Sequence, residues 1–160
     1  MSLFLAGSAV AALPVAGDPA PEEFGRTLNG DWPKLKDASG KVVVISFWAT
    51  WCGYCLKELP ILEGLQKVAK DNVQVIMVNT ESRERFREVS RAMTTLTLTQ
   101  THDQDKRGSI AYGVKGIPHL VIIGRDGKII EIHRGYGEST LPQIVETINA
   151  AMLVPAPERK

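Results

Sequence analysis

Two apolar runs rich in β-branched residues are the most regular feature of the chain. The first, VVVISFW, covers residues 42–48 and follows the turn-forming stretch DASGK, and the second, NVQVIMVN, covers residues 72–79. Such short runs are typical of strands that are buried on both faces of a sheet. Between them the apolar residues recur at helical spacing, at Leu56, Leu59, Leu62, Leu65, Val68 and Ala69. The pattern predicts a β-α-β unit, with Pro60 kinking the helix because proline lacks a backbone donor.

The rest of the chain alternates shorter helical and extended patterns. In order, these predict a helix over 81–93, a short strand over 95–99 (TLTLT), a short helix over 106–112, and a final helix from 139 or 140 to about 152. Before the final helix, the segments HLVIIG and KIIEIH flank Asp126-Gly127, a dipeptide typical of a hairpin turn. This order of elements implies an α/β fold with a central mixed sheet flanked by helices. Crossovers supply the parallel strand pairs and the hairpin an antiparallel one.

The N-terminal residues differ in composition from the rest of the chain. Leu3–Gly17 is apolar and rich in small residues, and no Lys or Arg occurs before Arg26. The stretch is shorter than the roughly 20 residues of a membrane span, but it suits the apolar core of a secretory signal, with Ala9-Val10-Ala11 as a cleavage site. Because a basic leader is missing, a signal remnant, a membrane-tethering remnant and an artificial leader stay open, and we favour export. We divide the chain into a leader plus linker (1–25), a domain (26–154) and a C-terminal tail (155–160).

Composition and charge narrow the function classes. The 160 residues are 44% hydrophobic and 23% charged, with a formal net charge of +1, which is ordinary for a soluble globular domain. This balance gives no reason to expect a nucleic-acid partner. The two cysteines are too few for a disulfide scaffold or for a zinc site made of cysteine alone.

Cys52 and Cys55 lie where the first predicted strand gives way to the helix. The free N–H groups and the dipole of a helix N-terminus stabilise a thiolate, and can lower a cysteine pKa from about 8.5 to roughly 3.5–7.5. Cys55 returns to the same face one turn later, within disulfide reach. We therefore predict a redox pair in which Cys52 attacks a substrate disulfide and Cys55 resolves the mixed disulfide. A bridge over so short a loop would constrain the unfolded chain little.

The segment KVVVISFWATWCGYCLKELP resembles the active-site segment of the thioredoxin superfamily, specifically its exported branch, the TlpA/ResA-like thiol-disulfide oxidoreductases. AYGVKGIPHLVIIGRDGKI resembles the proline loop and hairpin of that branch, and residues 81–105 lie where it carries a characteristic insertion. The match covers about residues 28–152. It implies a thioredoxin-like fold with a cis-proline loop beside the N-terminus of the CxxC helix. It also implies that neither an organic cofactor nor a metal is needed, since the two sulfurs hold both electrons.

The resemblance also implies roles for individual residues. Pro118 is expected to be the cis proline that packs beside the disulfide and offers its loop backbone to an extended substrate. The other expected substrate-binding residues are Trp51, Gly53, Tyr54 and Ile117. The Gly53-Tyr54 dipeptide also occurs in similar form in exported isomerases, whereas Ile117 resembles the reducing members, so the redox potential stays open.

The positions of the acidic residues near the cysteines are the main difference between this sequence and ordinary thioredoxins. Ser46 replaces the buried acid that many cytosolic thioredoxins carry six residues before the first cysteine. Glu58 matches a glutamate of the ResA-like branch, one turn after Cys55, and could relay a proton if burial raises its pKa. A solvated helix glutamate fits the same pattern. Glu81 resembles a second acidic position of the branch, and also fits the first turn of an ordinary helix.

We therefore expect an extracytoplasmic protein-disulfide reductase, in the periplasm or on the outer face of the cytoplasmic membrane, with a membrane tether left open for the full-length form. The resemblance implies protein thiols and disulfides as substrates, apocytochrome c among them, and a membrane thiol-disulfide reductase as electron donor. We expect a monomer. A disulfide isomerase or oxidase is one alternative. The other is a Cu(I)-binding protein with Cys52, Cys55 and His119 as ligands, because thiolates suit Cu(I).

Overall fold

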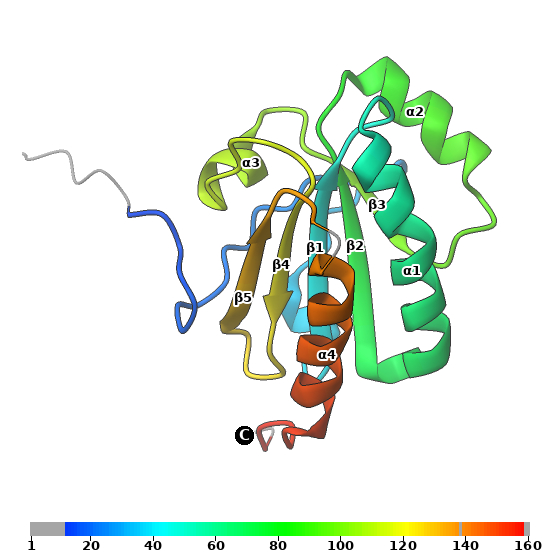
Figure 1. Cartoon of the computed structure of the whole chain (residues 1–160). Coiled ribbons are helices and arrows are strands. Elements are labelled where there is room, and N and C mark those ends of the chain that lie inside the picture. The colour runs from blue at the N-terminus through cyan, green and yellow to red at the C-terminus, as the bar shows by residue number, and fades with distance from the viewer. Residues whose placement is uncertain (1–11, 138, 159–160) are drawn as a thin grey trace, which may run out of the picture.

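A computed structural model describes residues 12–137 and 139–158, and its centre is a five-stranded sheet (Figure 1). The strand order is β3-β2-β1-β4-β5. The strands are β1 (Val42–Trp48), β2 (Val73–Asn79), β3 (Thr99–His102), β4 (His119–Ile123) and β5 (Ile129–Arg134). β1 and β3 each pair with β2 in parallel, whereas β4 pairs antiparallel with both β1 and β5. The predicted mixed sheet is confirmed.

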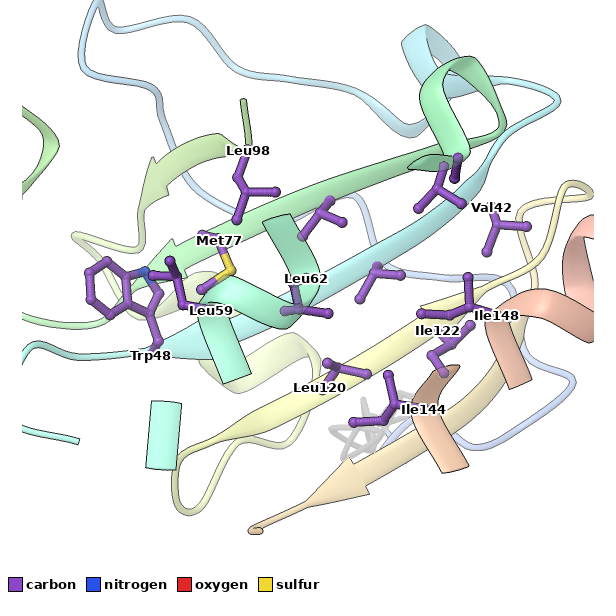
Figure 2. Close-up of a cluster of buried hydrophobic side chains, with 14 of the residues drawn as sticks. Val42, Trp48, Leu59, Leu62, Met77, Leu98, Leu120, Ile122, Ile144 and Ile148 are labelled. Atoms are coloured by element: carbon purple, nitrogen blue, oxygen red, sulfur yellow. The ribbon is translucent and has the colours of Figure 1, made fainter. Parts of the chain in front are cut away.

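Helices cover the two faces of this sheet unequally. They are α1 (Gly53–Ala69), α2 (Arg83–Ala92), α3 (Arg107–Ala111) and α4 (Thr140–Leu153), with short 3-10 turns η1 (Leu35–Ala38) and η2 (Lys70–Asn72). In Figure 1, α1 and α4 lie side by side over one face. Figure 2 shows the buried cluster beneath them, in which side chains such as Leu62 and Ile148 meet Val42, Leu120 and Ile122 of the sheet. The opposite face packs on η1, on Phe24 and on Tyr112 after α3.

The alternation of side chains along β1 explains why its sequence is apolar throughout. Val42, Val44 and Trp48 belong to the cluster under α1 and α4, whereas Val43, Ile45 and Phe47 belong to the cluster on the opposite face. A strand with apolar neighbours on both faces has no solvent side on which to place polar residues. Ser46 is the one exception within the strand, and it faces α1.

The strand predicted over 95–99 is wrong in position, because β3 begins only at Thr99. Its four residues pair with Ile76–Asn79 of β2. In the preceding segment the backbone N–H and the hydroxyl of Thr97 donate to the Glu63 carboxylate of α1, and Leu98 is buried. The alternating pattern thus reflects contacts of a loop with α1 rather than pairing with β2. Pro60 lies inside α1, which continues as one helix from Gly53 to Ala69, so the proline does not end the helix.

The segment before residue 26 packs on the domain. The Gly17 N–H donates to the Ile129 carbonyl (2.8 Å), the Ala20 N–H donates to the Gly127 carbonyl (3.0 Å), and Phe24 is fully buried. Much of the predicted leader, including Ala9-Val10-Ala11, lies outside the described residues. Within the described part of the chain, no helix combines the length and the apolar character needed to cross a membrane.

Candidate active site

The two cysteines lie at the junction between β1 and α1. A tight turn, in which the Cys52 N–H donates to the Ala49 carbonyl (3.1 Å), leads from the strand into the helix. Cys52 is the N-cap of α1, and its sulfur accepts a hydrogen bond from the Cys55 N–H (3.2 Å). The two sulfurs form a disulfide, with the Cα atoms 5.2 Å apart. Cys52 is 6% exposed and Cys55 is fully buried, so any partner must approach from the side of Cys52.

A cis peptide bond joins Ile117 to Pro118, as the resemblance implied. Phe47 of β1 pairs with His119 of β4, so Pro118 lies beside the end of β1 from which the chain turns toward Cys52. The Pro118 carbonyl accepts a hydrogen bond from the Gly135 N–H (2.8 Å), which ties the proline loop to the loop after β5.

Exposed aromatic side chains surround the disulfide. Trp51 is 74% exposed and Tyr54 is 54% exposed. The Tyr54 ring stacks on Tyr136, with centroids 4.7 Å apart and planes 15° apart, and Lys57 Nζ lies 5.2 Å from the Tyr54 centroid. Gly53 is open, since a Cβ atom there would meet nothing within 4 Å. Tyr136 was missed at the sequence level. The hairpin topology could have found it, because β5 must end beside the start of β4, where Pro118 lies.

Glu58 is buried in α1 and faces Ser46. It is 1% exposed, and the Ser46 hydroxyl donates to its carboxylate (3.1 Å). Burial raises the pKa of Glu58 to about 7, and the hydrogen bond from Ser46 offsets part of that rise. The residue is therefore not a solvated helix glutamate, and it titrates in the neutral range.

Glu81 lies just before α2 and holds the loop that carries Cys52. Its carboxylate accepts hydrogen bonds from the Thr50 N–H (2.8 Å), the Thr50 hydroxyl (2.7 Å) and the Asn79 amide (3.1 Å). Burial by itself would raise the pKa of Glu81, but these hydrogen bonds outweigh it and the net pKa is lowered. The sequence pointed to Glu81 but not to Asn79, two residues earlier, or to Thr50, which lies on the distant segment before Cys52.

His119 lies on the wrong face of the sheet for the alternative Cu(I) site. Its ring packs edge-on against Phe47, in the cluster opposite α1, whereas Cys52 and Cys55 belong to the cluster beneath α1. Burial, with a contribution from Arg134, lowers the pKa of His119 to about 4. The alternative set of Cys52, Cys55 and His119 is therefore not assembled, and residues 12–137 and 139–158 contain no group of three potential metal ligands.

A dithiol pair that closes at a helix N-terminus, beside a cis proline on this mixed sheet, defines a thioredoxin-like thiol-disulfide oxidoreductase. The comparison with protein families agrees with this class. The Redoxin family model matches residues 15–148, and the chain belongs to the Redoxin family.

Individual relatives narrow the likeness to the ResA-like branch. Thioredoxin-like protein YneN of Bacillus subtilis is 40% identical over 121 residues, which cover 74% of this chain and 71% of the relative. Thiol-disulfide oxidoreductase ResA of Bacillus thuringiensis is 33% identical over 133 residues (81% of this chain, 75% of the relative). A protein assigned as the thiol:disulfide interchange protein DsbE of Chlorobium tepidum superposes with a TM-score of 0.76 at 30% identity, over 87% of this chain and 99% of its own. The predicted family, fold and enzyme class are confirmed.

Proposed function

We propose that this oxidoreductase is an extracytoplasmic protein-disulfide reductase with Cys52 as its nucleophile and Cys55 as its resolving thiol. The observation that carries the proposal is the position of Cys52 as the N-cap of α1, with the Cys55 N–H directed at its sulfur. In the reduced protein, the same N–H and the helix dipole stabilise a thiolate at Cys52. Cys55, being fully buried, is disfavoured as an anion and stays a thiol until the mixed disulfide forms.

The exchange then proceeds in two displacements. The Cys52 thiolate attacks one sulfur of a substrate disulfide, so that a Cys52–substrate S–S bond forms, the substrate S–S bond breaks, and one substrate thiolate leaves. Cys55 loses its proton and attacks Cys52 Sγ, which breaks the mixed disulfide and releases the second substrate thiolate. Two electrons have then passed from the dithiol to the substrate, and the Cys52–Cys55 disulfide remains. Both electrons are held by sulfur, so the reaction needs no cofactor.

Glu58 is the proposed proton acceptor for Cys55. It follows Cys55 by three positions in α1, which places both side chains on one face of the helix. With a pKa of about 7, Glu58 is partly ionised at neutral pH and can both take and return a proton. Ser46 holds its carboxylate from the strand side.

The proposed substrate groove lies over the exposed end of this site. Ile117 and Pro118 present the loop backbone, while Trp51, Gly53 and Tyr54 form the facing wall. Gly53 leaves room for a substrate chain to approach closely, because a side chain is absent and the space beside it is open.

The cellular setting is part of the same proposal. One structural neighbour, at 27% identity and a TM-score of 0.68, is a pneumococcal exposed lipoprotein thioredoxin of Streptococcus pneumoniae. This neighbour supports a position outside the cytoplasm. Reduction of protein disulfides, with apocytochrome c as one substrate and a membrane thiol-disulfide reductase as electron donor, is what we propose from the ResA-like resemblance. We propose that the protein acts as a monomer.

The reduction potential of the Cys52–Cys55 pair tests the direction of exchange. The protein is equilibrated against glutathione or dithiothreitol, quenched and alkylated. For this two-electron couple about 30 mV corresponds to a tenfold change in the equilibrium constant. A value near or below about −220 mV supports the reductase. A value of about −120 to −180 mV contradicts it and favours an oxidase or isomerase.

A further inference from the structure

Two adjoining clefts lie where residues 25–32, the start of α2 and the loop after β3 meet. The larger has a volume of about 200 Å³ and the smaller about 80 Å³, and both are lined by Arg26, Arg83 and His102. The smaller is also lined by Arg87, and we call it the arginine cleft. Among the described residues, no Asp or Glu lines the arginine cleft.

The three arginines of the arginine cleft are exposed. In the described part of the chain, Arg26, Arg83 and Arg87 form neither an ion pair nor a side-chain hydrogen bond. Arg26 is held in place by Trp32, with its guanidinium carbon 4.6 Å from the ring centroid. Three arginines, each with a forked set of donors, thus line one small concave surface.

The acids nearby offset part of this charge: Glu84, between Arg83 and Arg87 on α2, interacts electrostatically with both but does not line the arginine cleft. Asp103, in the larger cleft, is buried and its carboxylate accepts hydrogen bonds from the Gly108 and Ser109 N–H groups (2.9 and 2.8 Å). Glu23, in the same cleft, lies 3.9 Å from Arg107. Asp105 also lines the larger cleft, outside the arginine cleft. The positive charge is therefore concentrated in the smaller cleft.

Direct contacts connect the arginine cleft to the active-site loop. Arg83 lies two positions after Glu81, whose carboxylate binds Thr50, and Thr50 lies two positions before Cys52. His102, which lines both clefts, has its Nε2 2.7 Å from the Glu81 carbonyl oxygen. Glu81 thus contacts both His102 of the cleft and Thr50 of the loop that carries Cys52.

We propose that the arginine cleft binds an acidic segment of the protein that exchanges disulfides with Cys52. Guanidinium groups match carboxylates in charge and in bidentate geometry, and the small volume admits side-chain carboxylates rather than a folded surface. The inference rests on the proposed exchange with protein disulfides, in either direction. It assigns a function to Arg83 and Arg87, which lie on the row Arg83, Arg87, Arg91 along α2.

Binding is tested first without redox chemistry. Hexaglutamate, which has no cysteine, is titrated into the oxidised protein while tryptophan emission is followed, since Arg26 lies over Trp32. We expect saturable binding that weakens as salt is raised. Arg83→Gln and Arg87→Gln should each weaken it about three- to fivefold, the value of one exposed ion pair. Arg91→Gln is the matched control, because Arg91 is exposed on the same helix but lines neither cleft. Absence of binding, or an equal loss in Arg91→Gln, overturns the proposal.

Exchange kinetics then separate this inference from the proposed reductase. The reduced protein is mixed with a disulfide-containing peptide that carries either a tetraglutamate or a tetraglutamine tail. We expect the glutamate peptide to react about tenfold faster in the wild type at low salt, and the advantage to disappear in Arg83→Gln/Arg87→Gln. Equal rates for the two peptides overturn the cleft proposal while leaving the oxidoreductase intact. A potential in the oxidising range would contradict the reductase and leave the cleft proposal standing.

Discussion

The Ser46 hydroxyl donates a hydrogen bond to the Glu58 carboxylate across the interface between β1 and α1, with 3.1 Å between the oxygens. Both side chains are buried, at 0% and 1% exposure. In this chain the buried acid beneath the active site therefore comes from the helix, and the strand supplies its hydrogen-bond donor. The pair sets the pKa of Glu58 at about 7, between the raising effect of burial and the lowering effect of the hydrogen bond.

Glu58 should control the pH profile of disulfide exchange. The rate of the resolving step should rise with an inflection near the Glu58 pKa of about 7, because the ionised carboxylate accepts the Cys55 proton. Glu58→Gln should remove this inflection. Ser46→Ala should move it to higher pH, because the hydrogen bond that lowers the pKa is lost. Exchange rates measured between about pH 5 and about pH 9 check the profiles of both variants. An unchanged profile in Glu58→Gln would exclude Glu58 as the proton acceptor.

The stability of the oxidised protein should fall as pH rises through the titration of Glu58. Its pKa is raised from 4.5 to about 7 on folding, so the native state holds a proton that the unfolded state has lost. The stabilisation is complete below pH 4.5 and is lost by about pH 7, a difference of about 3 kcal/mol. Glu58→Gln should lack this decline. Urea unfolding at about pH 5, near the lower end of the window, and at about pH 8, above its upper end, measures most of the decline. Parallel slopes in the two proteins would contradict the assigned pKa.

Cys52 should react first with an alkylating agent in the reduced protein. Its position at the start of α1 favours the thiolate, whereas Cys55 is fully buried. Because the thiolate is the species that reacts, Cys52 should be alkylated before Cys55. A short pulse of iodoacetamide followed by peptide mass spectrometry identifies the modified residue. The unfolded protein, in which both thiols should react alike, is the control, and faster labelling of Cys55 would reverse the two roles.

His119 should make the protein less stable in mild acid. Its folded pKa is lowered from 6.5 to about 4, so its contribution is complete above pH 6.5 and is lost as pH falls toward 4. The difference amounts to about 3 kcal/mol, because protonation would place a charge in the apolar layer beside Phe47. His119→Leu should lose the pH dependence over this window. Thermal unfolding at several pH values checks it, and an unchanged dependence would show that the imidazole is charged when buried.

Glu81 should hold the active-site loop only in its ionised form. Glu81→Gln removes the charge that accepts two hydrogen bonds from Thr50, and should cost about 1–3 kcal/mol at pH 7. Because the pKa of Glu81 is lowered on folding, this contribution is present at neutral pH and is lost in acid. Chemical unfolding at about pH 7 and about pH 3, on either side of the ordinary carboxyl pKa, measures the loss of stability in Glu81→Gln. Glu88→Gln, an exposed change on α2, should have little effect. Equal losses at both pH values would exclude a role for the charge.

The chemistry of the cysteine pair is determined largely by the sequence itself. Three local features carry these predictions. The apolar run at 42–48 predicts the strand, the apolar spacing after Cys52 predicts the helix, and the CxxC motif predicts the thiol at the start of that helix. The mixed sheet is implied by the order of elements, and the hairpin by Asp126-Gly127. These predictions depend on backbone preferences and on periods of two and 3.6 residues, which the sequence displays directly.

Only the tertiary structure decided the contacts between segments far apart in the chain. Glu58 fitted both a solvated and a buried residue until α1 packed on Ser46, and His119 fitted a copper ligand until the pleat of β4 turned it toward Phe47. The strand expected over 95–99 instead begins at Thr99, because Thr97 hydrogen-bonds to Glu63 of α1. Thr50 carries no local signal, and Tyr136 could be placed near Pro118 only through the pairing of β4 with β5. Burial, pairing and the resulting pKa values depend on long-range packing, which a local pattern of residues does not specify.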